Sequence, residues 1–241
     1  MTAPDRRSNA GAERSDDSES SRRVVLFDMD GVILEGWGTD TAVRRRALED
    51  LLEDRGLTVD DGCREALAAE GYDDDFRAAC EQIGVDPAAF YRARDRRSAK
   101  RTVSRLAAGN RRLCADVGAL EAIAERAAVG LVSNNYQPAV EFVVDHFRLT
   151  EFGVTRGRDL GPDGYRRRKP DPHYLNEALD ALGASDGLYV GDRATDVIAA
   201  ERAGLDSAFI RRDHNAGLEL GVEPTAEVGS LEELLPLVDD R

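Results

Sequence analysis

Residues 24–31 read Val-Val-Leu-Phe-Asp-Met-Asp-Gly, and this stretch constrains the fold more than any other part of the chain. An unbroken short apolar run predicts a strand that is buried on both faces, as the strands of parallel sheets are. The run ends in Asp28 and Asp30, which would point to the same side of an extended chain. Two neighbouring carboxylates repel each other unless a cation lies beside them. The stretch therefore predicts either a metal-assisted catalytic pair or an Asp-rich turn that closes a strand.

Apolar runs and helical patterns alternate over the second half of the chain. We expect strands at 127–132, 152–155, 188–190 and 207–210, helices at 119–126, 136–147, 172–182, 195–203 and 230–238, and a polar loop at 157–168. This alternation predicts an α/β fold with a Rossmann-like parallel sheet core and helices on both faces. Ligands bind such sheets at the carboxyl ends of the strands.

The region between the first strand and this alternating part has helical patterns throughout. Roughly four helices are expected from 39 to 110, one of them starting at Asp86-Pro87 with Asp as the cap and Pro in the first turn. So long a connection predicts an inserted α-helical domain. We expect a disordered tail at 1–22, which has too few apolar side chains to repay the entropy of ordering, a core at 23–38 and 112–241, and the helical insertion at 39–111.

Three of the apolar runs end in a polar residue that suits phosphate chemistry, namely Asp28, Ser133 and Asp192. A fourth element supplies Lys169 just before a helix. Only two of the 33 basic residues are lysines, so this position indicates a site where a compact point charge is required. Each signal is weak alone, but four in this order along an alternating α/β chain indicate a single site.

These residue types fit phosphoryl transfer. Asp28 ends the strand, and its carboxylate can attack phosphorus to give an acyl phosphate, which divides one difficult displacement into two easier ones. Asp30 can protonate the leaving alcohol and later take a proton from water. Mg²⁺ prefers oxygen ligands, and we expect it to bind the carboxylates of Asp28 and Asp192 and the carbonyl of Asp30. The phosphoryl oxygens need fixed donors, and the candidates are the Ser133 hydroxyl, the Lys169 ammonium and backbone N–H groups near Met29, Gly31 and Asn134.

The same segments resemble the four motifs of the haloacid dehalogenase superfamily of phosphohydrolases, at residues 27–32, 132–135, 168–172 and 191–196. The helical insertion after the first motif is similar to the family's cap domain in its commonest position. The resemblance implies that Asp28 is the nucleophile and Asp30 the general acid and base. It further implies that Ser133 and Lys169 bind and stabilise the phosphoryl group and that Asp192 binds Mg²⁺, supported by Asp196. Asp196 could equally be a stabilising partner of a helix dipole.

The function expected from these residues is a Mg²⁺-dependent phosphatase that works through an aspartyl-phosphate on a small phosphorylated metabolite, such as phosphoglycolate or a sugar phosphate. A phosphomutase would use the same core and is the first alternative. The second alternative comes from residues 92–112, which hold eight arginines and Lys100 against one acid, Asp95. This segment predicts either a solvated helix face that pairs with acidic neighbours or, less favoured, a surface for nucleic acid or another anionic polymer.

The amino-acid composition argues against some classes of protein. The net charge of -14 and the pI near 4.7 argue against a protein that is basic overall and coats nucleic acid or anionic membranes. No stretch approaches the length of a membrane span, so we expect a cytoplasmic protein. We expect it to be a monomer or a homodimer. Its acidic, lysine-poor composition resembles that of salt-adapted proteins. Three cysteines lack metal-ligand spacing, and we interpret them as small buried residues in a reducing compartment: Cys63, Cys80 and Cys114. The three isolated histidines also lack ligand spacing, and we interpret them as structural or surface residues: His146, His173 and His214.

Overall fold

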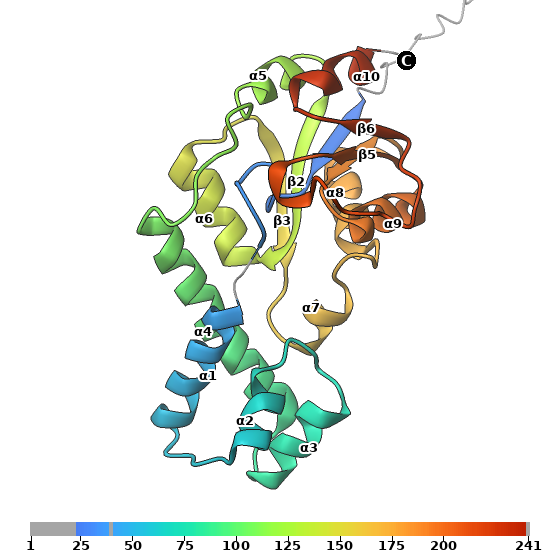
Figure 1. Cartoon of the computed structure of the whole chain (residues 1–241). Helices are drawn as coiled ribbons and strands as arrows, with labels where there is room; N and C mark the ends of the chain where they lie inside the picture. The colour runs from blue at the N-terminus through green and yellow to red at the C-terminus, as the bar shows by residue number, and fades with distance from the viewer. Residues whose placement is uncertain (1–22, 39–40, 240–241) are drawn as a thin grey trace, which may run out of the picture.

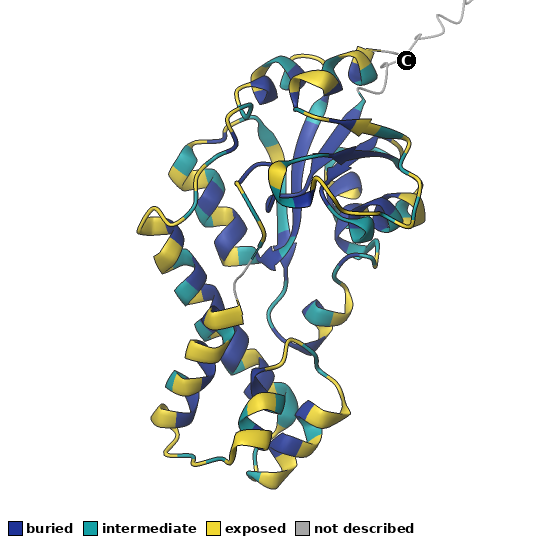
Figure 2. Ribbon diagram, in the orientation of Figure 1, coloured by how far each residue is buried: buried dark blue, intermediate teal, exposed yellow. Residues whose placement is uncertain are grey.

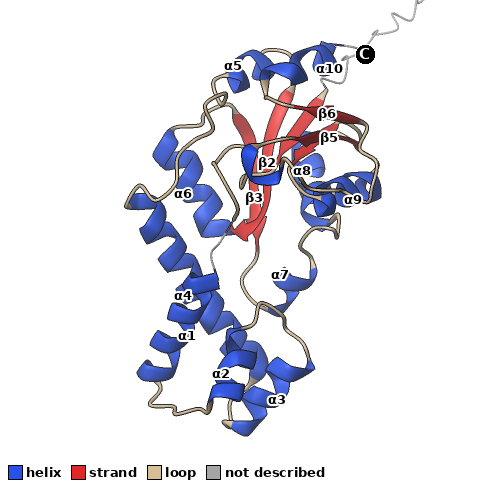
Figure 3. Ribbon diagram, in the orientation of Figure 1, coloured by secondary structure: helices blue, strands red, loops and turns tan. Residues whose placement is uncertain are grey.

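A six-stranded, wholly parallel sheet forms the centre of the computed structural model, which describes residues 23–38 and 41–239 (Figure 3). The expected disordered tail at 1–22 lies outside the described residues. The strand order is β3-β2-β1-β4-β5-β6. The strands are β1 (Val24–Phe27), β2 (Ala128–Tyr136), β3 (Phe152–Arg158), β4 (Leu188–Gly191), β5 (Asp206–Ile210) and β6 (Ala226–Val228). The α/β, Rossmann-like prediction is confirmed.

Helices cover both faces of the sheet because β1 alternates its side chains between two apolar clusters. Val25 and Phe27 pack with the cluster that includes side chains of α5, α6 and α10, whereas Val24 and Leu26 pack with the cluster of α8 and α9 (Figure 1). All four side chains are buried, as the apolar run predicts. These helices are α5 (Ala119–Ala124), α6 (Gln137–Phe147), α8 (His173–Leu182), α9 (Ala194–Ala203) and α10 (Leu235–Asp239).

Four further helices lie beyond the carboxyl ends of the strands, in the region between β1 and α5 (Figure 1). They are α1 (Thr41–Asp54), α2 (Asp61–Ala68), α3 (Asp74–Gln82) and α4 (Pro87–Ala107). The apolar faces of α1, α2, α3 and the first turns of α4 meet in a cluster of their own, whereas Ala99 and Leu106 of α4 pack with the core cluster of the sheet. The outer faces of these helices are exposed (Figure 2). The predicted start of α4 is confirmed, since the Asp86 carboxylate accepts a hydrogen bond from the Ala89 amide at 2.7 Å.

Short elements are where the structure departs from the prediction. The expected loop at 157–168 contains α7 (Pro162–Arg166), whose five residues are too few to show a helical period but are held by Tyr165, which packs edge-on to Tyr91 of α4. The strand β6 was not predicted either, because its three residues lie at the sheet edge and are not uniformly apolar. All three cysteines are buried thiols. Among the described residues, no helix is both long enough and apolar enough to cross a membrane.

Candidate active site

The carboxyl ends of three neighbouring strands bring the predicted residues together. Asp28 follows β1, Asp192 follows β4, and Ser133 lies within β2, which continues three residues beyond it. Because β2, β1 and β4 are adjacent and parallel, these residues reach the same edge of the sheet. A cavity of about 270 Å³ opens there and is lined by Asp28, Asp30, Ser133, Asn134, Lys169 and Asp196, among others.

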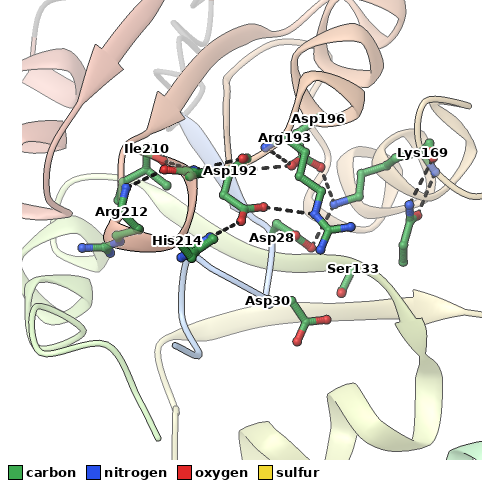
Figure 4. Close-up of polar contacts among 12 residues, drawn as sticks. Asp28, Asp30, Ser133, Lys169, Asp192, Arg193, Asp196, Ile210, Arg212 and His214 are labelled. Carbon is green, nitrogen blue, oxygen red and sulfur yellow. Dashed lines mark hydrogen bonds and ion pairs between the residues drawn. The ribbon is translucent and has the colours of Figure 1, made fainter. Parts of the chain in front are cut away.

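Lys169 forms a buried ion-paired group with two carboxylates. Its Nζ lies 2.9 Å from Asp28 Oδ1 and 2.7 Å from Asp196 Oδ1, and all three side chains are almost completely buried (Figure 4). Burial alone would lower the pKa of Lys169, but the negative charges of Asp196 and Asp28 outweigh burial and raise it. The lysine is therefore a fixed, fully charged ammonium beside the proposed nucleophile.

Asp192 completes a cluster of acids with Asp28 and Asp196, in which one carboxylate oxygen of each residue lies within 4.8 Å of the others. Burial, with the charges of Asp28 and Asp196, raises the pKa of Asp192 to about 8. Its Oδ1 is buried and has no hydrogen-bond partner among the described residues. A cluster of three buried carboxylates, in which Asp192 Oδ1 lacks a hydrogen bond, fits a divalent cation such as Mg²⁺.

Asp30 lies apart from this acid cluster (Figure 4). One carboxylate oxygen accepts a hydrogen bond from Asn135 Nδ2 at 3.1 Å, and the other is held by the guanidinium of Arg111. Arg111 also donates to the carbonyls of Glu35 and Gly36, so it fastens Asp30 to the loop that follows β1. The carboxylate of Asp30 is thus separate from the acid cluster, and any part for Asp30 in binding a metal would fall to its main-chain carbonyl.

Asp196 serves the site as well as its own helix. Its Oδ2 accepts hydrogen bonds from the backbone amides of Asp192 and Arg193, at 3.1 and 3.0 Å, across the start of α9. Its Oδ1 faces Lys169. The two interpretations of Asp196, helix-terminus partner and site residue, are therefore compatible, because different oxygens carry them out.

The amide side chain of Asn134 positions the lysine segment. Its Nδ2 donates to the Lys169 carbonyl at 3.1 Å, and its Oδ1 accepts from the Lys169 amide at 2.8 Å. The Ser133 hydroxyl accepts from the Asn135 amide at 3.2 Å and lines the cavity. Ser133 and Asn134 therefore both lie at the predicted site.

Gly31 requires a correction, because its amide already donates to the Leu34 carbonyl at 2.8 Å and is not a free phosphate donor. The residue is needed for another reason. Its φ of +86° favours glycine, and a Cβ there would lie 2.1 Å from Asp192 Oδ2. A side chain at position 31 would therefore displace the third carboxylate. The neighbouring Met29, also expected near the phosphate, is buried, and its carbonyl accepts from the amides of Ile33 and Leu34.

Comparison with known proteins agrees with this geometry. Residues 22–204 match the model of the haloacid dehalogenase-like hydrolases, which is more than half of the chain. The chain belongs to this family.

Proteins that are similar in sequence to this chain include phosphatases. Over 114 residues the chain is 36% identical to phosphoglycolate phosphatase 1 of Pseudomonas aeruginosa, a stretch that covers 46% of this chain and 41% of that protein. The match therefore spans about two fifths of the relative's length.

Two solved structures show the same fold. One is CbbY from Rhodobacter sphaeroides in complex with phosphate, with a TM-score of 0.58, 21% identity, and coverage of 88% of this chain and 96% of that chain. The other is a protein from Thermotoga maritima assigned as a β-phosphoglucomutase, with a TM-score of 0.53, 20% identity, and coverage of 90% and 99%.

Sequence patterns did not reveal three residues of this hydrolase site, Arg111, Asn135 and His214. His214 Nε2 lies 2.7 Å from Asp192 Oδ2, and burial with the nearby arginines lowers the pKa of His214. Neither Arg111 nor His214 has a diagnostic spacing from its partner, whereas Asn135 lies within the predicted motif at 132–135, where it was given no role. Trp37 in the loop after β1 is half exposed and also lines the cavity.

The arginine-rich segment follows the interpretation of a helix face paired with acidic neighbours. Arg94 is buried and donates to the carbonyls of Leu67 and Ala69. Arg97 and Arg101 pair with Asp54 and Asp50 of α1, at 2.5 Å for both shortest contacts. The described contacts of these arginines are thus within the protein, and they give no support to a nucleic-acid surface.

Proposed function

We propose that this hydrolase is a Mg²⁺-dependent phosphatase that cleaves phosphoric monoesters of small metabolites through a phospho-Asp28 intermediate. The observation that carries the proposal is the buried group of Asp28, Lys169, Asp192 and Asp196, drawn from three separate segments to the carboxyl edge of one sheet. Asp28 lines the cavity and sits beside a fixed ammonium. A carboxylate so placed can attack phosphorus in line with the leaving alcohol.

Each of the other side chains has a role that its contacts support. Lys169 would offset the charge that develops on the phosphoryl oxygens, and Ser133 would donate its hydroxyl to them. Asp30, held by Arg111 and Asn135, would give a proton to the leaving oxygen and later take one from the attacking water. The acyl phosphate then breaks at its P–O bond, which frees Asp28 and releases inorganic phosphate.

The residues that would hold Mg²⁺ are Asp28 and Asp192, with the main-chain carbonyl of Asp30 and with Asp196 in support. When bound, the ion would supply positive charge that offsets the repulsion among the carboxylates and the phosphoryl oxygens. The buried, unsatisfied Oδ1 of Asp192 supports this assignment. We further propose that residues 39–111, which contain α1–α4, act as a cap, because Thr41, Arg44 and Glu70 of this segment line the cavity.

The proposal is tested by phosphate release from 2-phosphoglycolate, sugar phosphates and an aryl phosphate, with and without Mg²⁺. We expect Asp28→Asn to lower kcat by a factor on the order of 10⁴ or more, as removal of a nucleophile does. Asp180→Asn, on the exposed face of α8, is the matched control. Full activity of Asp28→Asn would refute the assignment of the nucleophile.

A phosphomutase is the second candidate, since the fold is similar to that of the Thermotoga maritima protein assigned as a β-phosphoglucomutase. In that reaction the phosphoryl group passes from Asp28 to a second hydroxyl of the sugar in place of water. Incubation with glucose 1-phosphate and a trace of glucose 1,6-bisphosphate separates the two candidates. A mutase yields glucose 6-phosphate, and a phosphatase yields glucose and inorganic phosphate.

A further inference from the structure

The leaving group of the substrate must lie in the part of the cavity that the helical segment lines. Thr41 and Arg44 of α1 and Glu70 after α2 line the same cavity as Asp28 and Lys169. Its volume of about 270 Å³ is below the range of about 300–1,000 Å³ that is usual for drug-sized ligands. In a cavity this small, a substrate whose phosphoryl group lies at Asp28 has its other end close to these residues.

Arg44 is largely buried, and the ion pair that it makes with Glu70 among the described residues is a long one. Its side chain is 14% exposed, and its Nε is buried without a hydrogen-bond partner among the described residues. Glu70 Oε2 lies 3.9 Å from its NH2, beyond hydrogen-bonding distance, and the other oxygen of Glu70 contacts Arg168. A guanidinium keeps its charge and offers five donors, so leaving its buried Nε without a partner costs free energy that an incoming anion would remove.

The other cations of the cavity already have roles near the phosphoryl site. Lys169 lies between Asp28 and Asp196. The Arg193 guanidinium lies over the Trp37 ring at 4.9 Å, and its Nε, also buried without a hydrogen-bond partner among the described residues, lies 3.6 Å from Asp192 Oδ1, so its charge faces the acid cluster. Arg44 is the lining arginine that comes from α1, on the side of the cavity away from the sheet.

We propose that Arg44 binds a second anionic group of the substrate, a carboxylate or a second phosphate, and so selects monoesters that carry a negative charge at both ends. Arginine suits this role because its planar fork pairs with either group through two parallel hydrogen bonds. The inference rests on the proposed phosphatase function and adds to it the chemical class of the leaving group.

The test compares pairs of substrates that differ in the second anion. One pair is 2-phosphoglycolate and ethyl phosphate, and the other is glucose 1,6-bisphosphate and glucose 6-phosphate. We expect the wild-type enzyme to favour the doubly anionic member of at least one pair by roughly tenfold or more in kcat/KM, as a charged hydrogen bond would provide. The pair that shows the preference identifies the second group as carboxylate or phosphate. Arg44→Met should lower the ratio at least tenfold, whereas Arg44→Lys should keep part of it.

Controls separate this inference from the proposed function. Arg45→Met, at an exposed neighbouring position of α1, should keep the wild-type ratio. Equal kcat/KM within both wild-type pairs, or an unchanged ratio in Arg44→Met, overturns the inference while the phosphatase function stands. A ratio that falls in Arg105→Met but not in Arg44→Met also overturns it, because Arg105 lines an adjoining cavity of about 220 Å³ and not the cavity at Asp28.

If the wild-type enzyme hydrolyses neither member of either pair, the proposed function fails. Calorimetric titration of Asp28→Asn with 2-phosphoglycolate and ethyl phosphate then decides the inference by affinity. Tighter binding of 2-phosphoglycolate that Arg44→Met removes supports it, and equal affinities overturn it. Circular dichroism of each variant confirms that it is folded.

Discussion

Asp95 of α4 and Arg158 of β3 form a buried ion pair between the helical segment and the sheet. The Arg158 NH1 and NH2 groups donate to Asp95 at 2.9 and 3.2 Å, and the Gly161 amide donates to the same carboxylate at 3.0 Å. Tyr136 Oη adds a longer contact at 3.4 Å. Asp95 is fully buried, and Arg158 is 5% exposed. Asp95 is also the only acid among residues 92–112.

Asp95→Ala should therefore be strongly destabilising. It removes the carboxylate that receives these donors and leaves a buried guanidinium charge uncompensated, a change that typically costs about 3–5 kcal/mol. In a chain of this size about 1 kcal/mol lowers Tm by roughly 2–4 °C, so we expect a fall of about 6–20 °C. Thermal and urea unfolding followed by circular dichroism measure it.

Two comparisons make this prediction specific to burial. Asp54→Ala breaks the pair with Arg97, also on α4, but Asp54 has 61% of its side chain exposed, and we expect a loss below about 1 kcal/mol. Replacing both buried charges with apolar residues, as Asp95→Leu with Arg158→Met, should recover most of the stability lost in Asp95→Ala. A loss in Asp95→Ala no larger than that in Asp54→Ala would refute the reasoning.

Three further predictions concern the site and the charge of the chain. Lys169→Met should lower kcat for any phosphate ester by about 10²–10³, because the ammonium beside Asp28 is lost, and an unchanged kcat would exclude its role. The pKa of Asp192 is raised from 3.8 to about 8, so the folded protein holds a proton that the unfolded chain has released. The free energy of unfolding of the Mg²⁺-free protein should consequently fall as the pH rises from about 4 to about 8. Added Mg²⁺ should raise Tm more at pH 8 than at pH 6, because Asp192 is then ionised. An Asp192→Asn variant that kept the full Mg²⁺ response would contradict this. Finally, the negative charges of a chain with a net charge of -14 repel one another. Raising KCl from 0.1 to 1 M shortens the screening length from about 10 Å to about 3 Å, so Tm should rise with KCl. A lower Tm at 1 M KCl would contradict salt adaptation.

Local patterns were sufficient to predict the main elements and most of the site. The apolar run at Val24 needed no partner to be recognised as a buried strand, and Asp86-Pro87 marked the start of a helix by capping chemistry alone. Asp28, Ser133 and Asp192 were predicted to meet because strand ends in a parallel sheet share one edge, a property of the fold class that alternation in the sequence already reveals.

Tertiary structure alone decided the contacts between segments that carry no common pattern. Arg111 reaches Asp30 across 81 positions of the chain, and Asp95 reaches Arg158 across 63. The packing of α4 and of the loop after it against the core decides which arginine pairs with which carboxylate. The charge of a side chain does not predict that pairing. The sequence by itself thus determined which residues stand at the ends of the strands, because periodicity and apolar runs are local. Only the folded chain decided how Asp30 is oriented, how α4 is anchored and which arginine faces the cavity, because these depend on long-range packing.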